Sequence, residues 1–114
     1  MITVYTLKTC DTCKKALKWL DENSIPYLNK DVREDGISRQ AIVQIVEAVG
    51  YDKAVNRRST TWRNLDESTK SSLSDANAAS LISDNPTLMK RPAFVDGSSI
   101  YVGFDKKVME RLSQ

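Results

Sequence analysis

Two cysteines near the N-terminus, Cys10 and Cys13, are the side chains of this sequence best suited to chemistry. A free thiol titrates near ~8.5 and is a weak nucleophile at neutral pH, whereas a thiolate attacks disulfides readily. An apolar strand-like segment precedes Cys10 and a helical pattern follows it, so we expect Cys10 at a helix N-terminus. There, free N–H groups and the positive end of the helix dipole stabilise a thiolate. Cys13 follows one turn later and can displace whatever Cys10 has captured.

The activation of Cys10 must come from the helix end and from arginine or lysine. The chain contains no histidine, which excludes a Cys–His pair. Lys14 and Lys15 add positive charge next to the cysteines, and Asp11 opposes it modestly. The Lys14, Lys15 and Lys18 side chains otherwise suit a solvated helix face.

A zinc site and plain burial in a core are the alternative roles of the cysteine pair. A closed zinc site needs four ligands, and the chain offers no further Cys or His, so only a site shared between two copies stays open. Ordinary burial is the commonest fate of a lone cysteine. The spacing of this pair, after a strand and at the start of a helix, favours redox chemistry. We expect no bound cofactor and no metal.

Length and charge limit the number of domains and the classes of function that this sequence can have. The 114 residues suit one domain, residues 1–114, with its own core. A net charge of +2 is too small to indicate nucleic acid or membrane binding, and no apolar run reaches membrane-spanning length. Thr3, Lys8 and Thr9 interrupt any signal-peptide core. We therefore expect a cytoplasmic monomer, in which a cysteine pair is kept reduced and acts transiently.

The N-terminal third is predicted to form a strand, a helix and a second strand. Ile2–Leu7 has strand composition, the helix after Cys10 ends at Asn23-Ser24, and Ile25–Leu28 is the second strand. A helical crossover between two strands makes them parallel and right-handed. This is the structural context that a thioredoxin-like dithiol motif requires.

A helical insertion is expected over about residues 37–90, after a charged loop from Lys30 to Gly36. Its apolar content is low, so we expect part of it to be mobile. Its expected elements are a helix between Ser38 and Gly50, a polar stretch from Asp52 to Lys70 fastened by Trp62 and Leu65, and a helix over Asp75–Ser83.

The last third of the chain is predicted to add two strands to the sheet and a final helix. Ala93–Val95 and Ile100–Val102 flank the turn signal Asp96-Gly97 and predict an antiparallel hairpin, after which Asp105 caps a final helix. The complete order predicts an α/β protein with a thioredoxin-like fold, β-α-β then β-β-α around a mixed sheet, interrupted by the helical insertion.

Four short motifs occur along the chain: Cys10-x-x-Cys13-Lys14-Lys15-Ala16, the segment Asn56–Arg63, Lys90-Arg91-Pro92 and Val102-Gly103-Phe104. In this order and at these separations they resemble the family of glutaredoxin-coupled arsenate reductases, their YffB-like relatives and the Spx regulators. The resemblance covers nearly the whole chain. It implies an active-site cysteine at Cys10 and a proline, Pro92, that faces it and is typically cis in such folds.

In arsenate reductases of this type, arginines around the cysteine hold an oxyanion. By resemblance, Arg91 matches the arginine directly before the proline, and either Arg57 or Arg58 matches one in mid-chain. Guanidinium groups stabilise thiolates and oxyanions by paired, charge-assisted hydrogen bonds. The position of a third arginine falls near Phe104, which cannot bind an anion, and this departure argues against arsenate as the substrate. The stretch from Arg57 to Arg63 most resembles the YffB-like branch. We assign catalysis to Cys10, Cys13 and Arg91, and substrate binding to Arg57, Arg58, Pro92, Thr12 and Lys14.

The residues and the resemblance support two hypotheses. As an enzyme, the protein is a thiol–disulfide oxidoreductase that attacks a small-molecule or mixed-disulfide substrate through Cys10 and takes electrons from glutathione, its expected co-substrate, or from glutaredoxin. As a regulator of the Spx kind, it senses oxidation through a Cys10–Cys13 switch and binds RNA polymerase. Neither hypothesis involves direct nucleic acid binding or a membrane.

Overall fold

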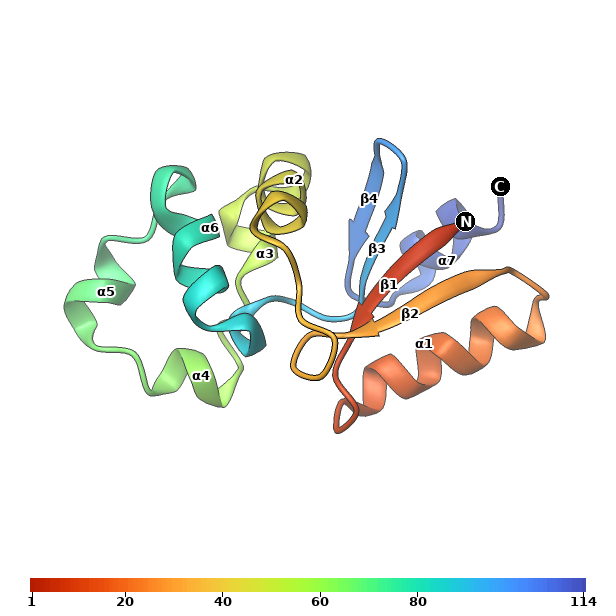
Figure 1. Ribbon diagram of the computed structural model, residues 1–114, viewed down its shortest axis with the longest axis horizontal. Helices are drawn as coiled ribbons and strands as arrows, with labels where there is room; N and C mark the ends of the chain where they lie inside the picture. Colours follow the sequence, from red (N-terminus) through yellow and green to blue (C-terminus); the bar gives the residue numbers. More distant parts are fainter.

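A four-stranded mixed sheet organises the molecule in the computed structural model, which describes residues 1–114 (Figure 1). The strand order is β2-β1-β3-β4. Strand β1 pairs in parallel with β2 and antiparallel with β3, and β3 and β4 form an antiparallel hairpin, as predicted. The strands span Ile2–Thr6 (β1), Tyr27–Asp31 (β2), Ala93–Asp96 (β3) and Ser99–Val102 (β4).

Two helices cover one face of the sheet. Helix α1 (Asp11–Glu22) is the crossover between β1 and β2, and helix α7 (Lys106–Leu112) is the last element. Asp105 caps α7 by accepting a hydrogen bond from the Val108 N–H at 2.9 Å, as its sequence predicts. Seven buried residues form the core on this face: Ile2, Val4, Ala16, Leu20, Phe94, Val108 and Leu112.

The helical insertion lies between β2 and β3 and extends away from the sheet at the left of Figure 1. Ser38 caps its first helix, accepting from the Ala41 N–H at 3.1 Å, and Gly50 ends it with φ of +86°, a conformation that glycine adopts without strain. The elements are α2 (Arg39–Val49), α3 (Tyr51–Ala54), α4 (Thr60–Arg63), α5 (Glu67–Ser71), α6 (Asp75–Asp84) and the 3₁₀ turn η1 (Pro86–Leu88).

The insertion contributes more to the apolar core than its low apparent apolar content indicates, and its expected mobility stays a prediction. The larger core cluster, with 13 buried residues, lies on this side, against 7 on the other face. Its members come from segments far apart in sequence, such as Val32, Ile45, Ile82 and Met89, so no local window shows the full apolar content. Trp62 packs against this cluster, in agreement with its predicted anchoring role.

The second strand also differs from its prediction. It begins at Tyr27 rather than Ile25 and runs through Lys30 to Asp31, into the expected loop. Each residue of β2 pairs with one of β1, from Ile2 opposite Tyr27 to Thr6 opposite Asp31. Because β2 is an edge strand, Asn29 stays exposed while the backbone pairs with β1, and this pairing overrides the low strand propensity of the polar residues. None of the helices has the length and apolar character needed to cross a membrane.

Candidate active site

Cys10 caps the N-terminus of α1. Its backbone is extended, and its sulfur accepts a hydrogen bond from the Cys13 N–H at 3.4 Å. The Cys10 N–H donates to the Leu7 carbonyl at 2.9 Å, which closes the turn between β1 and the helix. The Cys10 side chain is partly exposed. A sulfur that caps a helix and reaches solvent is placed for nucleophilic attack, because the free N–H groups stabilise its anion.

Cys13 is buried and is held as a thiol. Only 1% of the residue is exposed, and the two cysteines are not joined by a disulfide. Burial, followed by a hydrogen bond with the Cys10 sulfur and the proximity of its charge, raises the pKa of Cys13 to about 12. The Leu7 backbone and the Arg91 charge lower that pKa but do not offset burial. The two sulfurs therefore have different environments, one accessible and one protonated.

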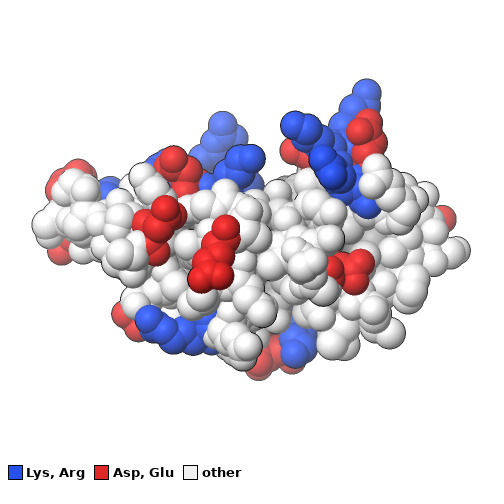
Figure 2. All heavy atoms as spheres, turned by 90° about the horizontal axis from the view of Figure 1, so that it is seen from above, with Lys and Arg blue, Asp and Glu red and all other residues white.

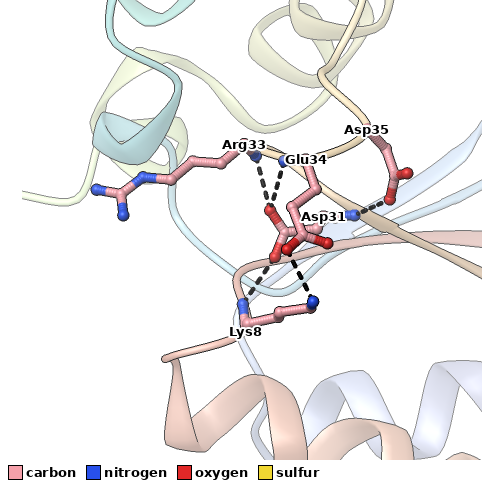
Figure 3. A network of polar contacts seen from close by, with 5 residues as sticks. All are labelled: Lys8, Asp31, Arg33, Glu34 and Asp35. Atoms are coloured by element: carbon pink, nitrogen blue, oxygen red, sulfur yellow. Dashed lines mark hydrogen bonds and ion pairs between the residues drawn. The ribbon is translucent and has the colours of Figure 1, made fainter.

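Asp31 fixes the loop that carries Cys10 (Figure 3). Its carboxylate accepts from the Lys8 N–H at 2.8 Å through Oδ2, and from the N–H groups of Arg33 at 2.8 Å and Glu34 at 3.0 Å through Oδ1. The Lys8 ammonium group pairs with the Glu34 carboxylate at 2.7 Å. Asp31 itself is 5% exposed and lies at the end of β2. The network ties the segment after β1 to the turn after β2.

The pKa of Asp31 follows from this arrangement. Burial acts to raise it, but hydrogen bonds from the backbone of Glu34, Arg33 and Lys8 outweigh burial and lower it below its ordinary value. The carboxylate is therefore ionised and holds its three donors at neutral pH. The sequence around Asp31 predicts only a charged loop, so the role of this residue was missed. The sequence does contain a signal for this role. An aspartate at the end of a strand often accepts hydrogen bonds from the backbone N–H groups two or three residues later.

Arg91 comes directly before a cis peptide bond to Pro92, and its charge acts on Cys13. Its Nη1 donates to the carbonyls of Thr87 at 2.7 Å and Met89 at 3.0 Å, which fixes the guanidinium plane. Its Nε is buried and has no hydrogen-bond partner. Such a donor is costly to leave unpaired, by about 1–3 kcal/mol. Because its charge acts on the Cys13 thiol, Arg91 can stabilise an anionic group near the two sulfurs.

The other predicted binding residues lie apart from Arg91. Arg57 forms an ion pair with Asp52 at 2.8 Å, and its guanidinium lies 5.5 Å from the centre of the Trp62 ring. Arg57 and Arg58 line a groove whose lining includes neither cysteine nor Arg91. Thr12 and Lys14 are exposed on the first turn of α1, on either side of Cys13. The structure thus brings Cys10 and Cys13 together, with the Arg91 charge acting on Cys13, and places Arg57 and Arg58 at another surface. The predicted contact of Pro92 with Cys10 stays a prediction.

Comparison with known proteins shows the family and the fold of this chain. The profile described as "ArsC family" matches residues 5–112. A Haemophilus influenzae relative, "Uncharacterized protein", is 48% identical over 107 residues, which cover 94% of this chain and 94% of that protein. "Global transcriptional regulator Spx" of Staphylococcus aureus is 32% identical over 113 residues, which cover 97% of this chain and 86% of that protein. The solved structure of "YFFB (PA3664) protein" matches with a TM-score of 0.92 and 34% identity over 100% of both chains. These likenesses confirm the predicted resemblance and the thioredoxin-like α/β fold.

Proposed function

This chain belongs to the ArsC family, and on that premise we propose that it is a thiol–disulfide oxidoreductase that uses glutathione, with Cys10 as its nucleophile. The observation that carries the proposal is the contrast between the two sulfurs. Cys10 caps α1 and reaches solvent, whereas Cys13 is buried with its pKa raised to about 12. Only Cys10 both lies at a helix N-terminus and is accessible to a substrate.

The proposed reaction is exchange with a glutathione mixed disulfide. The Cys10 thiolate attacks the glutathione sulfur, a new disulfide forms between Cys10 and glutathione, and the substrate leaves as a thiolate that takes up a proton. A second glutathione thiolate then attacks the glutathione sulfur of this adduct. It releases the Cys10 thiolate and forms oxidised glutathione. The sum converts one mixed disulfide and one glutathione into one free thiol and one oxidised glutathione.

The environment of Cys13 favours glutathione, rather than Cys13, as the group that resolves the adduct. Resolution needs a thiolate, and Cys13 is a thiol at neutral pH. When Cys10 is bound in a disulfide, its charge no longer raises the pKa of Cys13. Burial, the largest cause, remains. Cys13 is therefore a slow resolving group, and it supports catalysis mainly through its backbone N–H, which donates to the Cys10 sulfur.

Arg91 has a proposed role in binding the anionic partner. Two backbone carbonyls already fix its Nη1, so the guanidinium is oriented before a ligand arrives, and its buried Nε has a free donor. A carboxylate or other oxyanion would bind the guanidinium by charge-assisted hydrogen bonds from its N–H groups that remain free. We place this chemistry in the cytoplasm, carried out by a monomer with no bound cofactor.

The test compares the same substitution at the two cysteines. Turnover of a glutathione mixed disulfide is followed with excess glutathione, coupled to glutathione reductase. We expect Cys10→Ser to abolish turnover and Cys13→Ser to retain most of it. The proposal fails if the wild type turns over none of a panel of mixed disulfides, or if Cys10→Ser remains active.

The 32% identity to the Spx regulator of Staphylococcus aureus favours a second candidate, a redox switch. In that case oxidation would join Cys10 to Cys13 and change a binding surface for RNA polymerase. A switch is oxidised stoichiometrically and shows no glutathione turnover, so the same assay separates the two candidates.

A further inference from the structure

A groove of about 820 Å³ runs beside the outer strand of the sheet, away from the cysteines. One wall comes from the end of α2, from α3 and from residues 55–58, and the other comes from α7. Figure 2 shows Lys and Arg side chains standing on both sides of a hollow in the surface. Residues 100–102 of β4 lie between the walls.

The charge of the groove is strongly positive. Six basic side chains and two acidic ones line it, an excess of four, although the whole chain carries only +2. Both acids already have partners, since Asp52 pairs with Arg57 at 2.8 Å and Asp105 caps α7 at 2.9 Å. The basic residues are Lys53, Arg57, Arg58, Lys90, Lys107 and Arg111. They act together on any occupant, which favours an anionic one.

The edge of β4 offers backbone hydrogen bonds to an occupant. The Gly103 N–H donates to the Pro92 carbonyl at 2.8 Å. In an antiparallel ladder such bonded pairs alternate with unbonded ones, so Tyr101 bonds to β3 while Ile100 and Val102 point their N–H and C=O groups away from it. No other strand lies beyond β4. The groove therefore contains a short template for one more strand.

We propose that this groove binds an extended acidic segment of a partner protein, which pairs with β4 as a fifth strand. Three features select this occupant. The free edge fits a polypeptide backbone, the basic walls fit carboxylates, and partly exposed apolar residues of the lining, Val49, Ile100 and Val102, fit intervening apolar side chains. With four residues in β4, the segment has about the same length.

Other occupants match fewer of these features. If a second copy of this chain paired with β4 edge to edge, two positively charged grooves would face each other and repel. Inorganic polyphosphate or RNA would satisfy the charge but would use neither the backbone groups of Ile100 and Val102 nor the apolar lining. The proposal does not depend on the thiol chemistry, since neither Cys10 nor Cys13 lines the groove.

The test uses the full chain, labelled with ¹⁵N, and a synthetic peptide of alternating glutamate and valine with blocked ends. We expect saturable shifts of amide signals along β4 and slower hydrogen exchange at the Ile100 and Val102 amides. The same peptide with lysine for glutamate should not bind. Cys10→Ser should bind the acidic peptide as the wild type does, so a failure of the thiol mechanism leaves this result unaffected.

Two neighbouring lysines of α7 give a matched control. Both are exposed, but Lys107 lines the groove and Lys106 does not. We expect Lys107→Glu to weaken peptide binding about tenfold and Lys106→Glu to weaken it less than about threefold. Equal effects of the two substitutions, no binding of the acidic peptide, or competition by polyphosphate without protection at Ile100 and Val102 would each overturn the proposal.

Discussion

Asp31→Asn tests how the fold positions the nucleophile. Asn keeps the size of the side chain and one oxygen, which can stay on the Arg33 and Glu34 N–H groups. The amide nitrogen then faces the Lys8 N–H in place of Oδ2, which accepts at 2.8 Å in the wild type. Two donors cannot bond, so the link to the loop before Cys10 is lost. The remaining contacts of Asp31 are weakened but retained.

The expected loss of stability in Asp31→Asn comes from the one hydrogen bond between the Lys8 N–H and Asp31. Removing a hydrogen bond to a charged acceptor costs about 1.5–3 kcal/mol, and we expect the free energy of unfolding to fall by that amount. Asp35→Asn is the matched control. Its carboxylate is exposed and accepts one hydrogen bond, from the Asp31 N–H at 2.8 Å, which an Asn oxygen can keep. We expect a loss below about 0.5 kcal/mol there.

The assay is urea unfolding followed by tryptophan fluorescence, with the rate of Cys10 alkylation measured on the same samples. The Asp31 variant should unfold at lower urea and react more slowly at Cys10, because the loop is no longer fixed. Equal stabilities of the Asp31 and Asp35 variants would refute the reasoning, and so would an unchanged alkylation rate together with the expected loss of stability.

The pH dependence of this effect has a definite sign. The pKa of Asp31 is lowered in the folded protein, so its ionised form is favoured by folding. The stabilisation is fully present above the unfolded value of about 3.9 and is lost as pH falls through the folded value. The difference in the free energy of unfolding between wild type and Asp31→Asn should therefore become smaller below about pH 4. A difference that stays constant down to about pH 2 would contradict the charged network.

Three further predictions concern other parts of the site and the core. At about pH 8, iodoacetamide should modify Cys10 and spare Cys13, whose pKa is raised to about 12, and unfolding should remove the difference; equal rates in the folded protein would contradict the burial of Cys13. Arg91→Lys keeps the charge but loses the planar guanidinium whose separate nitrogens can bond the two carbonyls and an oxyanion in fixed directions, so kcat/KM for a glutathione mixed disulfide should fall about tenfold, whereas a change within about twofold would remove Arg91 from the site. Phe94→Ala empties a fully buried site on the central strand β3 and should cost about 3–5 kcal/mol in urea unfolding; a loss below about 1 kcal/mol would mean that this core is loosely packed.

The parts of the fold set by local signals could be predicted from the sequence. The strand before Cys10, the capped helices at Ser38 and Asp105 and the hairpin around Gly97 each depend on residues within a few positions of one another. The position of Cys10 at the N-terminal end of α1 also depends on residues close to it in sequence. Such features survive in the structure because the tertiary fold adds to the local preference rather than opposing it.

The rest depends on contacts between distant segments. The extension of β2 to Asp31 is set by pairing with β1, and the packing of the insertion is set by side chains that no local window contains together. The family resemblance predicts Arg57 and Arg58 at the substrate site, and their place in the groove beside β4 follows from how the insertion lies against the sheet. Their role in substrate binding stays a prediction. No spacing in the sequence relates Asp31 to Lys8, so that contact could not be foreseen.

The measurement that tests the central claim most directly is the site of the covalent intermediate. The reduced wild-type protein is mixed with one equivalent of a glutathione mixed disulfide, quenched with acid, and fragmented by mass spectrometry to separate Cys10 from Cys13. We predict glutathione on Cys10 and a free thiol at Cys13, with the adduct removed by added glutathione. Glutathione on Cys13, or immediate formation of a Cys10–Cys13 disulfide without added glutathione, would contradict the account.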